Sequence, residues 1–295
     1  MWCRLTDQRG AWAAELTLPG ARDATSRALL AVDHAPGSQF AALQAALREG
    51  VPLPPDLACL ALEGSGFRGQ RGRSWQAHRG NLHVCRLARL DLPAGSVQAA
   101  LTALPAVAAA RAIEVATHGR VSPGIKWVND LMLGGRKIGG VLSATQLHGA
   151  LATYVLTGVG INVAHTPELV RHPSAPPAGS LTELASADAP TLATLTLALL
   201  VELDAGVAQL RAGHGAELVE AYRRRSIVIG RQVAVWPVSE ALGIEEPLAT
   251  GRVIALRNDL ALDVEGWGRP VHAGRLTLLE GSDVSADGGE NGEDG

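Results

Sequence analysis

The chain has 295 residues, of which 47% are hydrophobic and 19% are charged, so it is long enough for two domains and a substantial core. This composition is typical of an ordinary soluble globular protein. The net charge of −3 excludes a general attraction to nucleic acid or acidic membranes. Residues 281–295 carry five acidic residues and no basic one, so the charge is +2 without them.

Cysteine usage and the absence of targeting signals indicate the cytoplasm. Cys3, Cys59 and Cys85 form no CxxC pair and are odd in number, which favours a reducing compartment. The first residues lack the basic and apolar regions of a signal peptide. The most apolar run, residues 192–203, is short and interrupted by threonines, so we expect no contact with a membrane.

The first elements along the chain are predicted to be two helices and a strand. Asp23 or Thr25 is placed to cap a helix beginning at residues 27–30, and residues 38–48 repeat apolar side chains on one helical face. The apolar run at residues 57–62 is typical of a buried strand, with residues 81–87 as the strand that returns.

Residues 64–75, between these two strands, contain four glycines and three arginines. Glycine lets backbone N–H groups approach a ligand, and arginine offers forked donors suited to carboxylate and phosphate. The loop alone leaves three interpretations open: a solvated surface loop, a basic loop that contacts RNA, and a cradle for a phosphate in catalysis.

The middle of the chain predicts helices and β-hairpins. A helix is expected over residues 96–116, and strands over 125–133, 136–142 and 154–163, with a Gly134-Gly135 turn joining the first two strands. Strands that arrive as hairpins between helices indicate an α+β domain with a mixed or antiparallel sheet.

Two lysines lie on the two arms of the predicted hairpin. Alternation along the first arm places Lys126 and Asp130 on one side of the strand. A lysine inside an apolar strand is costly unless it faces solvent or binds something. Gly139 and Gly140 follow Lys137 and favour binding, because glycine in a strand often marks the close approach of a ligand or a backbone. The nine histidines show no metal-ligand spacing, so no metal site is predicted.

The last part of the chain changes from helices to short strands. Residues 180–183 fit a capping box, and helices are expected over 192–210 and 216–225. Strands expected at 232–236, 251–256, 260–264 and 275–279 predict a small β-barrel. We therefore expect domains at residues 1–225 and 226–280, followed by a disordered acidic tail at 281–295.

Several of these stretches, in the same order, resemble the biotin protein ligase family over roughly residues 20–280. The loop from Gly66 to Trp75 is similar to the family's biotinyl-adenylate loop. Lys126-Trp127-Val128-Asn129-Asp130, followed by residues 134–140, is similar to its catalytic lysine hairpin. Residues 158–163 resemble the strand that reaches adenine, and the terminal barrel resembles the SH3-like C-terminal domain.

The resemblance implies a class II synthetase-like catalytic domain that makes biotinyl-5′-AMP and pyrophosphate from biotin and ATP, with Mg²⁺ accompanying the ATP. The biotin then passes to a lysine of the biotin carboxyl carrier domain of acetyl-CoA carboxylase or a related carboxylase. The implied catalytic residues are Lys137 and Arg68. The implied binding residues are Ala24, Thr25, Ser26, Gly64, Gly69, Gln70, Trp75, Lys126, Asn129, Asp130, Gly139, Gly140 and Asn162.

The chain also departs from the family pattern. Gly64 stands where the family has a glutamine, Phe67 where it has a glycine and Gln70 where it has the second arginine of the loop. Ala24 and Ser26 replace a serine and an asparagine. The departures leave two alternatives: a ligase or transferase of the same fold that uses lipoate or octanoate, and a non-catalytic binder of biotin or its adenylate.

About twenty residues precede Thr25, too few for the winged helix of family members that repress transcription, so no DNA binding is expected. The sequence leaves the oligomeric state open, with a homodimer among the alternatives.

Overall fold

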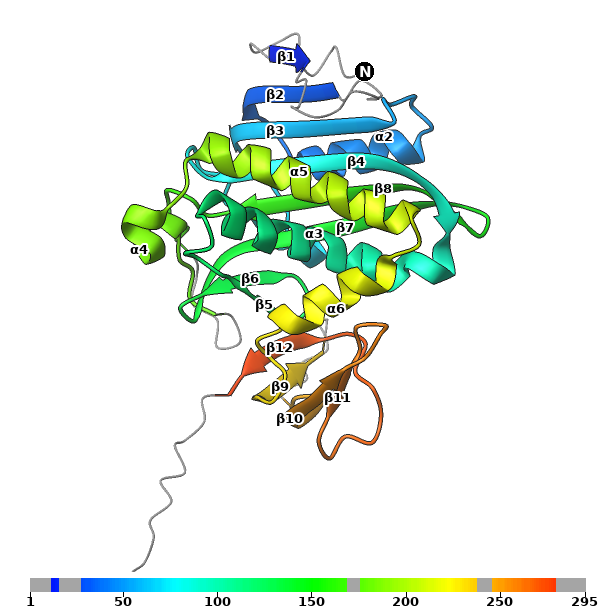
Figure 1. Cartoon of the computed structure of the whole chain (residues 1–295), viewed down its shortest axis with the longest axis vertical. Helices are drawn as coiled ribbons and strands as arrows, with labels where there is room; N and C mark the ends of the chain where they lie inside the picture. Colours follow the sequence, from blue (N-terminus) through cyan, green and yellow to red (C-terminus); the bar gives the residue numbers. More distant parts are fainter. Residues whose placement is uncertain (1–11, 16–27, 169–175, 238–245, 280–295) are drawn as a thin grey trace, which may run out of the picture. The chain divides into compact units, whose positions relative to one another are not determined.

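The computed structural model describes residues 12–15, 28–168, 176–237 and 246–279 (Figure 1). The chain divides into two compact units, one of Met1–Ile227 with Arg257–Leu260, and one of Val228–Leu256 with Ala261–Gly295. The strands are β1 (Trp12–Glu15), β2 (Ala28–Ala35), β3 (Asp56–Gly64), β4 (Leu82–Pro93), β5 (Gly124–Lys126), β6 (Asp130–Leu133), β7 (Arg136–His148), β8 (Leu151–Ile161), β9 (Gln232–Trp236), β10 (Ala249–Leu256), β11 (Leu262–Val264) and β12 (Arg275–Leu278). The helices are α2 (Gln39–Arg48), α3 (Ala94–Ala116), α4 (Leu181–Ala185), α5 (Leu192–Arg211) and α6 (Gly215–Arg225), with short 3₁₀ turns at Gln70–Gly72 and Ser186–Asp188.

The first unit is built on an eight-stranded sheet in the order β1-β2-β3-β4-β8-β7-β6-β5. The β2–β3 pair is parallel and the other neighbours are antiparallel, which confirms the predicted mixed sheet. The second unit contains a separate antiparallel sheet in the order β11-β10-β9-β12, formed by the four short strands that the sequence predicts.

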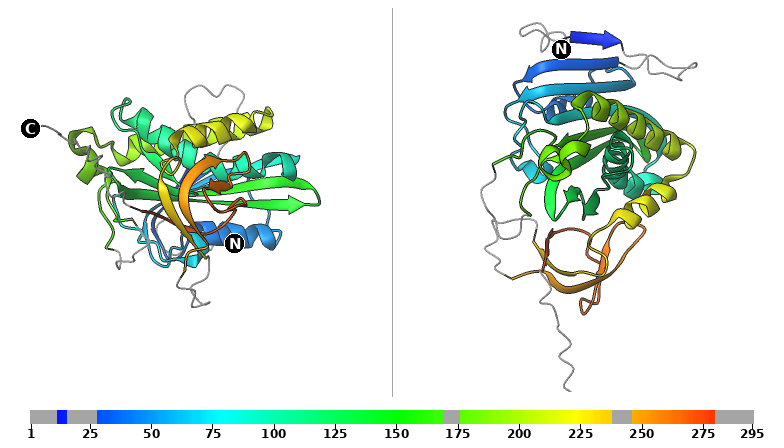
Figure 2. Two further views of the ribbon diagram at one scale, coloured as in Figure 1. Left: turned by 90° about the horizontal axis from the view of Figure 1, so that it is seen from below. Right: turned by 60° about the vertical axis from the view of Figure 1, so that its left-hand side comes forward.

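Helices cover both faces of the first sheet. Figure 2 shows α2 below the sheet and α3 and α5 above it. Leu43 of α2 is fully buried against the sheet residues Leu30, Leu57 and Leu156. On the other face, the many alanines of α3 allow close packing against α5, where a Cβ on Gly206 would lie 3.1 Å from Leu104.

Helix starts follow the capping signals in the sequence. The Ser38 hydroxyl accepts a hydrogen bond from the N–H of Ala41 at the start of α2 (3.3 Å), and Ser180 accepts one from Glu183 (3.3 Å). The helices predicted at residues 38–48, 96–116, 192–210 and 216–225 are thus confirmed as α2, α3, α5 and α6.

Helices α3 and α5 are each long and apolar enough to cross a membrane by length and composition alone. The apolar run at 192–203 continues to Arg211 as one helix of 20 residues, so the argument that this run is too short was wrong. In the structure 67% of the apolar window of α3 and 39% of that of α5 are buried.

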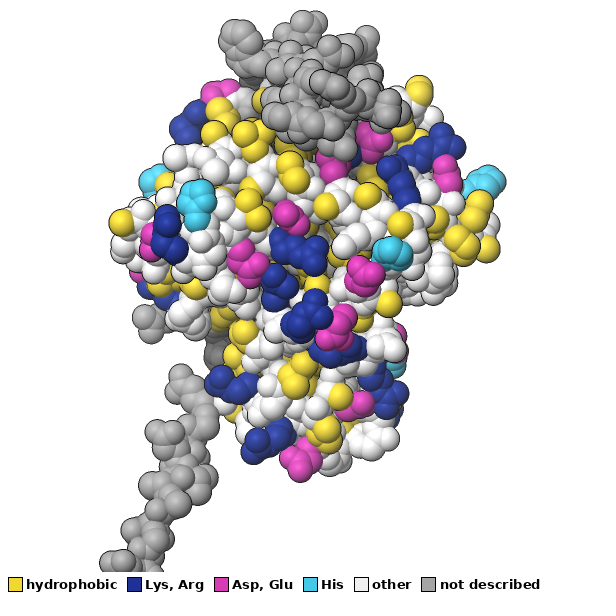
Figure 3. Space-filling model, in the orientation of Figure 1, with side chains coloured by type: hydrophobic (Ala, Val, Ile, Leu, Met, Phe, Trp, Pro, Cys, Tyr) yellow, Lys and Arg dark blue, Asp and Glu magenta, His cyan; other side chains and the backbone are white. Residues whose placement is uncertain are grey.

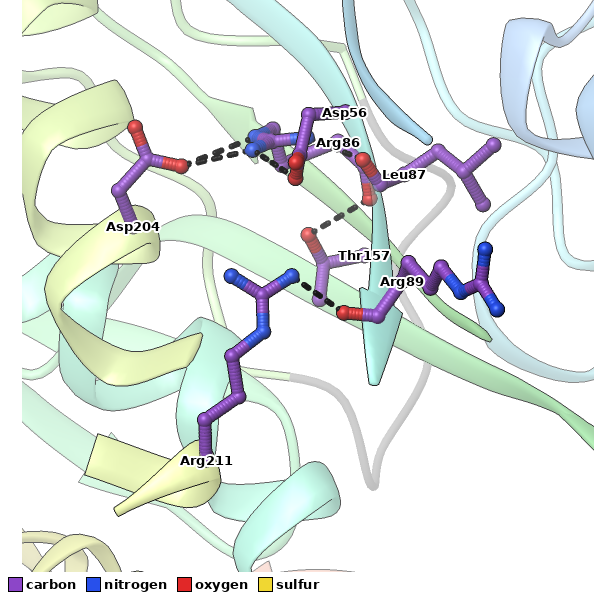
Figure 4. A network of polar contacts seen from close by, with 7 residues as sticks. All are labelled: Asp56, Arg86, Leu87, Arg89, Thr157, Asp204 and Arg211. Atoms are coloured by element: carbon purple, nitrogen blue, oxygen red, sulfur yellow. Dashed lines mark hydrogen bonds and ion pairs between the residues drawn. The ribbon is translucent and has the colours of Figure 1, made fainter. Parts of the chain in front are cut away.

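A buried ion-pair network fastens α5 to the sheet (Figure 4). The Arg86 guanidinium on β4 is 4% exposed, and its Nη2 lies 2.8 Å from carboxylate oxygens of both Asp56 on β3 and Asp204 on α5. The carbonyl of Arg86 accepts a hydrogen bond from Thr157 on β8 (3.3 Å). One side chain therefore connects two strands to a helix.

The surface viewed in Figure 3 mixes basic and acidic side chains. At the end of α6, Arg223 and Arg224 pair with Glu220, and Arg225 lies 2.7 Å from Glu114. These arginines do not form an unpaired basic stripe of the kind that binds nucleic acid.

Two expected elements differ in the structure. The expected helix start at 27–30 is wrong for its described residues 28–30, because β2 starts at Ala28 and pairs with β3. Sheet pairing therefore decides this segment, while the capping candidates Asp23 and Thr25 lie outside the described residues. The expected strand over 125–133 is broken by a turn at residues 127–129, and β5 and β6 pair with each other.

Candidate functional site

A row of five residues crosses the sheet of the first unit. Lys126 pairs with Asp130, Asp130 with Gly140, Gly140 with Gly160, and Gly160 with His83, each directly opposite the next on neighbouring strands. Directly opposed residues project to the same face of a sheet. The row therefore lines up two lysine-hairpin residues, two glycines and a histidine that the sequence separates by up to 77 positions.

The acidic member of the row holds both lysines. Lys137 Nζ lies 2.5 Å from Asp130 Oδ1, and Lys126 Nζ lies 4.0 Å from Asp130 Oδ2. The turn at 127–129, rather than strand alternation, brings Lys126 to Asp130. The backbone of Lys137 is fixed by two bonds to the neighbouring segment: its N–H donates to Pro177 (2.8 Å) and its carbonyl accepts from Gly179 (2.9 Å).

Burial changes the electrostatics of Lys126, which is 5% exposed. Desolvation lowers the pKa of its ammonium, Lys137 and Arg73 lower that pKa further, and Asp130 opposes the shift. The charge of Arg73 is therefore felt at the lysine pair, although Arg73 belongs to the glycine–arginine loop.

Lys126 and Lys137 are the only two lysines in the sequence, which has 24 arginines. Lysine carries a compact charge whose pKa shifts on burial, whereas arginine keeps its proton. Both lysines of the chain thus lie at this site, beside Asp130.

The Trp75 indole packs against the two glycines of the row. A Cβ on Gly160 would meet the indole at 2.5 Å, so only glycine leaves room for the ring at that position. A Cβ on Gly140 would lie 3.6 Å from Trp75 and from Lys137 Nζ. The indole and the lysine are therefore neighbours above Gly140. Gly139 has another role, because a Cβ there would meet the carbonyl oxygen of Gly160 at 2.7 Å.

The glycine–arginine loop folds back on itself. The N–H of Trp75 donates to the carbonyl of Phe67 (3.0 Å), and that of Gly69 donates to Arg73 (2.7 Å). The exposed Arg68 donates from Nη1 to the carbonyl of Gly72 (3.3 Å). The tip, which includes Gln70, thus forms a short turned structure whose arginines stand at the surface.

Two of the departures from the family pattern, Gly64 and Phe67, are neighbours in the structure. A Cβ on Gly64 would meet the Phe67 ring at 2.3 Å and the carbonyl of Ala35 at 2.7 Å. The phenyl ring occupies the space that a side chain at position 64 would need. Phe67 and Gly64 are therefore compatible as a pair, and a glutamine at position 64 would require the ring to move.

Two expected binding residues are held by the fold. Asn129 Nδ2 donates to the carbonyl of Val141 (3.0 Å), which joins the turn to β7. Asn162 is 2% exposed, and its Nδ2 donates to the carbonyl of Gly179 (3.0 Å). Both amides shape the backbone around Lys137. Ala24, Thr25 and Ser26 lie outside the described residues.

Sequence reasoning missed His83 as a candidate. It is 3% exposed on β4, beside Gly160, and its ring contacts both Trp75 and Phe67. A histidine within an apolar strand could have drawn attention to His83. Its position opposite Gly160, however, depends on how the strands are aligned, and the sequence does not show that alignment.

Residues 47–162 match the sequence model of the biotin/lipoate A/B protein ligase family. A biotin acetyl-CoA-carboxylase ligase of Mycobacterium tuberculosis is 33% identical over 219 residues, which cover 72% of this chain and 75% of that protein. The chain therefore belongs to the biotin protein ligase family, whose members are ligase enzymes.

Solved structures show the same fold. The biotin protein ligase from Aquifex aeolicus, in complex with biotin and ATP, has a TM-score of 0.63 and 18% identity, covering 86% of this chain and 99% of that one. The biotin protein ligase from Leishmania major, in complex with biotinyl-5-AMP, has a TM-score of 0.51 and 20% identity, covering 86% and 98%.

Proposed function

We propose that this chain is a biotin protein ligase that makes biotinyl-5′-AMP and then transfers biotin to a lysine of a biotin carboxyl carrier domain. Family membership supports the activity. The observation that carries the assignment to this site is the Lys137–Asp130 pair beside Trp75, on a row of glycines.

In the first half-reaction, a carboxylate oxygen of biotin attacks the α-phosphorus of ATP, and pyrophosphate leaves with the bonding electron pair. Two anions must meet, so a cation placed between them stabilises the developing charge. Lys137 is the ammonium suited to this position, and Asp130 orients it at 2.5 Å. In the second half-reaction, a neutral amine of the carrier attacks the acyl carbon and AMP leaves.

The loop arginines complete the phosphate site. Arg68 stands at the surface of the loop, and Arg73 is close enough to influence the pKa of Lys126. Arg73 thus supplies a positive charge to the loop, in which Gln70 replaces the family's second arginine. Because the Trp75 indole packs on Gly140 and Gly160, an adenylate would contact the part of the ring that these glycines leave open.

Mg²⁺ is expected to accompany the ATP phosphates as part of the substrate. Within the described ranges, no group of three or more His, Cys, Asp or Glu side chains could hold a metal ion.

The proposal extends to the second unit and to the setting of the reaction. The order β11-β10-β9-β12 and the antiparallel pairing support an SH3-like barrel. The free, buried thiols of Cys59 and Cys85 support a reducing, cytoplasmic location. The paired arginines of α6 support a partner other than DNA.

A second candidate is a ligase or transferase of the same fold with lipoate or octanoate as its acyl substrate. The Phe67 ring in the space beside Gly64 favours it, because it offers an apolar surface where the family has a glutamine. The matched family itself includes both biotin and lipoate ligases.

Pyrophosphate release from ATP, measured with biotin, lipoate and octanoate in turn, tests the assignment. We expect release with biotin, reduced about 10²–10³-fold in Lys137→Ala, which is the usual effect of removing a group that stabilises a transition-state charge. Arg120→Ala, which removes an exposed cation paired with Asp188, is the control and should keep full activity.

Each other result has a defined meaning. Release only with lipoate or octanoate would establish the second candidate. Absence of release with all three acids, while calorimetry detects biotin binding, would show a non-catalytic binder.

A further inference from the structure

His83 is a buried polar residue on a central strand, and the steps above assign it no role. Its Nδ1 lies 3.4 Å from the indole Nε1 of Trp75, and its Nε2 lies 3.2 Å from the carbonyl oxygen of His78. Both ring nitrogens therefore have a partner.

These partners select one form of the ring. A carbonyl oxygen only accepts, so Nε2 must carry a proton and donate to His78. An indole N–H only donates, so Nδ1 must be unprotonated and accept from Trp75. The neutral tautomer protonated at Nε2 satisfies both bonds, whereas the imidazolium would set two N–H groups against each other. Burial lowers the pKa of His83 to about 4, which keeps the ring neutral.

The same ring contacts both ends of the glycine–arginine loop. Phe67, at its start, packs edge-on against His83 with ring centroids 5.8 Å apart. Trp75, at its end, donates its indole N–H to His83 and its backbone N–H to the carbonyl of Phe67. His83 thus joins the base of the loop to β4, directly beside Gly160.

We propose that His83 is a positioning residue, which holds the Trp75 indole against Gly140 and Gly160 beside Lys137 and so fixes the part of the ring that meets the nucleotide. The effect on nucleotide handling rests on the proposed function. The hydrogen bond and the placement of the indole do not, so they can be tested separately.

The first test observes the indole itself by ¹H–¹⁵N NMR. The chain has six tryptophans, and the Trp75 indole resonance is identified by its loss in Trp75→Phe. In His83→Leu we expect this resonance to move upfield and to exchange faster with solvent, while the others stay in place. His83→Gln, whose amide can both accept and donate, should recover part of the shift. An unmoved Trp75 resonance in His83→Leu would overturn the proposal.

Folding of the leucine variant is checked by the remaining indole resonances. Should it not fold, His83→Asn takes its place, because its amide is too short to reach Trp75, and the same criterion applies. His148→Leu, at an exposed histidine at the end of β7, is the matched control and should leave all indole resonances unchanged.

The second test measures pyrophosphate release as a double-mutant cycle. His83→Leu should raise the KM for ATP about two- to tenfold, the factor that one hydrogen bond carries, with a smaller change in kcat. In a Trp75→Phe background the same substitution should add nothing further, because its effect passes through the indole. Equal effects in both backgrounds would contradict the proposal. Absence of release in the wild type would count against the proposed function and leave the NMR result valid.

Discussion

At the scale of single residues, the carboxylate of Asp130 interacts with both lysines of the site. Asp130 lies 2.5 Å from Lys137 and 4.0 Å from Lys126, and Lys126 is the more buried of the two. Lys137 is therefore the stronger partner of Asp130. Lys126 remains in the core with a weaker interaction, which leaves its burial incompletely compensated.

Because Lys126 is buried, the free energy of unfolding of the chain should depend on pH. The pKa of Lys126 is lowered in the folded state, so between that value and the ordinary lysine pKa the unfolded chain binds a proton that the folded chain lacks. Stability from this group therefore rises with pH across that window. Lys126→Met should stabilise the chain at pH 7, and its advantage should shrink as the pH approaches about 10.

Urea unfolding between pH 7 and pH 10 measures this difference. Arg120→Met is the control, because it replaces an exposed cation and its stability difference from the wild type should not vary with pH in this range. A constant difference between Lys126→Met and the wild type would show that Lys126 does not titrate in this range.

At the scale of elements, the Arg86 network determines how firmly α5 is held on the sheet. Removing one partner of a buried ion pair leaves the other charges uncompensated, at a cost of about 3–5 kcal/mol. We expect Arg86→Met to lower the free energy of unfolding by this amount, since Asp56 and Asp204 both face Arg86.

The same strand offers a matched control. Arg89 pairs with Asp91 at the surface, where both side chains are well exposed, so Arg89→Met should leave stability nearly unchanged. Combining Arg86→Met with Asp56→Asn and Asp204→Asn should recover part of the loss. Similar urea midpoints for Arg86→Met and Arg89→Met would disprove a stabilising role for the network.

Local signals in the sequence predicted many elements correctly. Ser180 caps its helix as predicted, and Gly134 and Gly135 adopt positive φ values of 55° and 74° in the predicted hairpin turn. These features depend on the backbone preferences of a few neighbouring residues. The start of β2 and the turn at 127–129 were missed because strand pairing, a long-range interaction, decides them.

The candidate site was predictable only in part, for the same reason. Lys137, Trp75 and Gly140 belong to recognisable motifs, and the structure brings them together. The contact between Trp75 and Gly160, and the place of His83, follow from the register of five strands. A shift of one residue in any pairing would turn those side chains to the other face.

At the scale of the whole molecule, the chain leaves its first compact unit and returns to it. Arg257–Leu260 groups with the first unit although its neighbours in sequence belong to the second. The buried indole N–H of Trp127 donates to the carbonyl of Leu260 (2.8 Å). A residue of the lysine hairpin thus relies on a segment more than a hundred positions away.

We expect truncation after Ile227 to destabilise the first unit, because the indole N–H of Trp127 loses the carbonyl of Leu260 as its acceptor. Trp127→Phe should lower the melting temperature of the full chain and add less to the truncated one, since the hydrogen bond is already absent there. Calorimetry of the four proteins measures both effects. An equal cost of Trp127→Phe in both lengths would show that the contact with Leu260 does not contribute.

The small number of lysines affects how far an acyl adenylate could acylate the protein that made it. An acyl adenylate reacts with neutral amines that it meets, and arginine side chains keep their protons at physiological pH. Of the only two lysines, Lys126 is buried and Lys137 is engaged by Asp130. An adenylate that escapes therefore finds no other lysine side chain on the protein that made it. Acylation of the chain's own lysine side chains is therefore limited to these two positions, and an escaped acyl group remains available for other amines or for water.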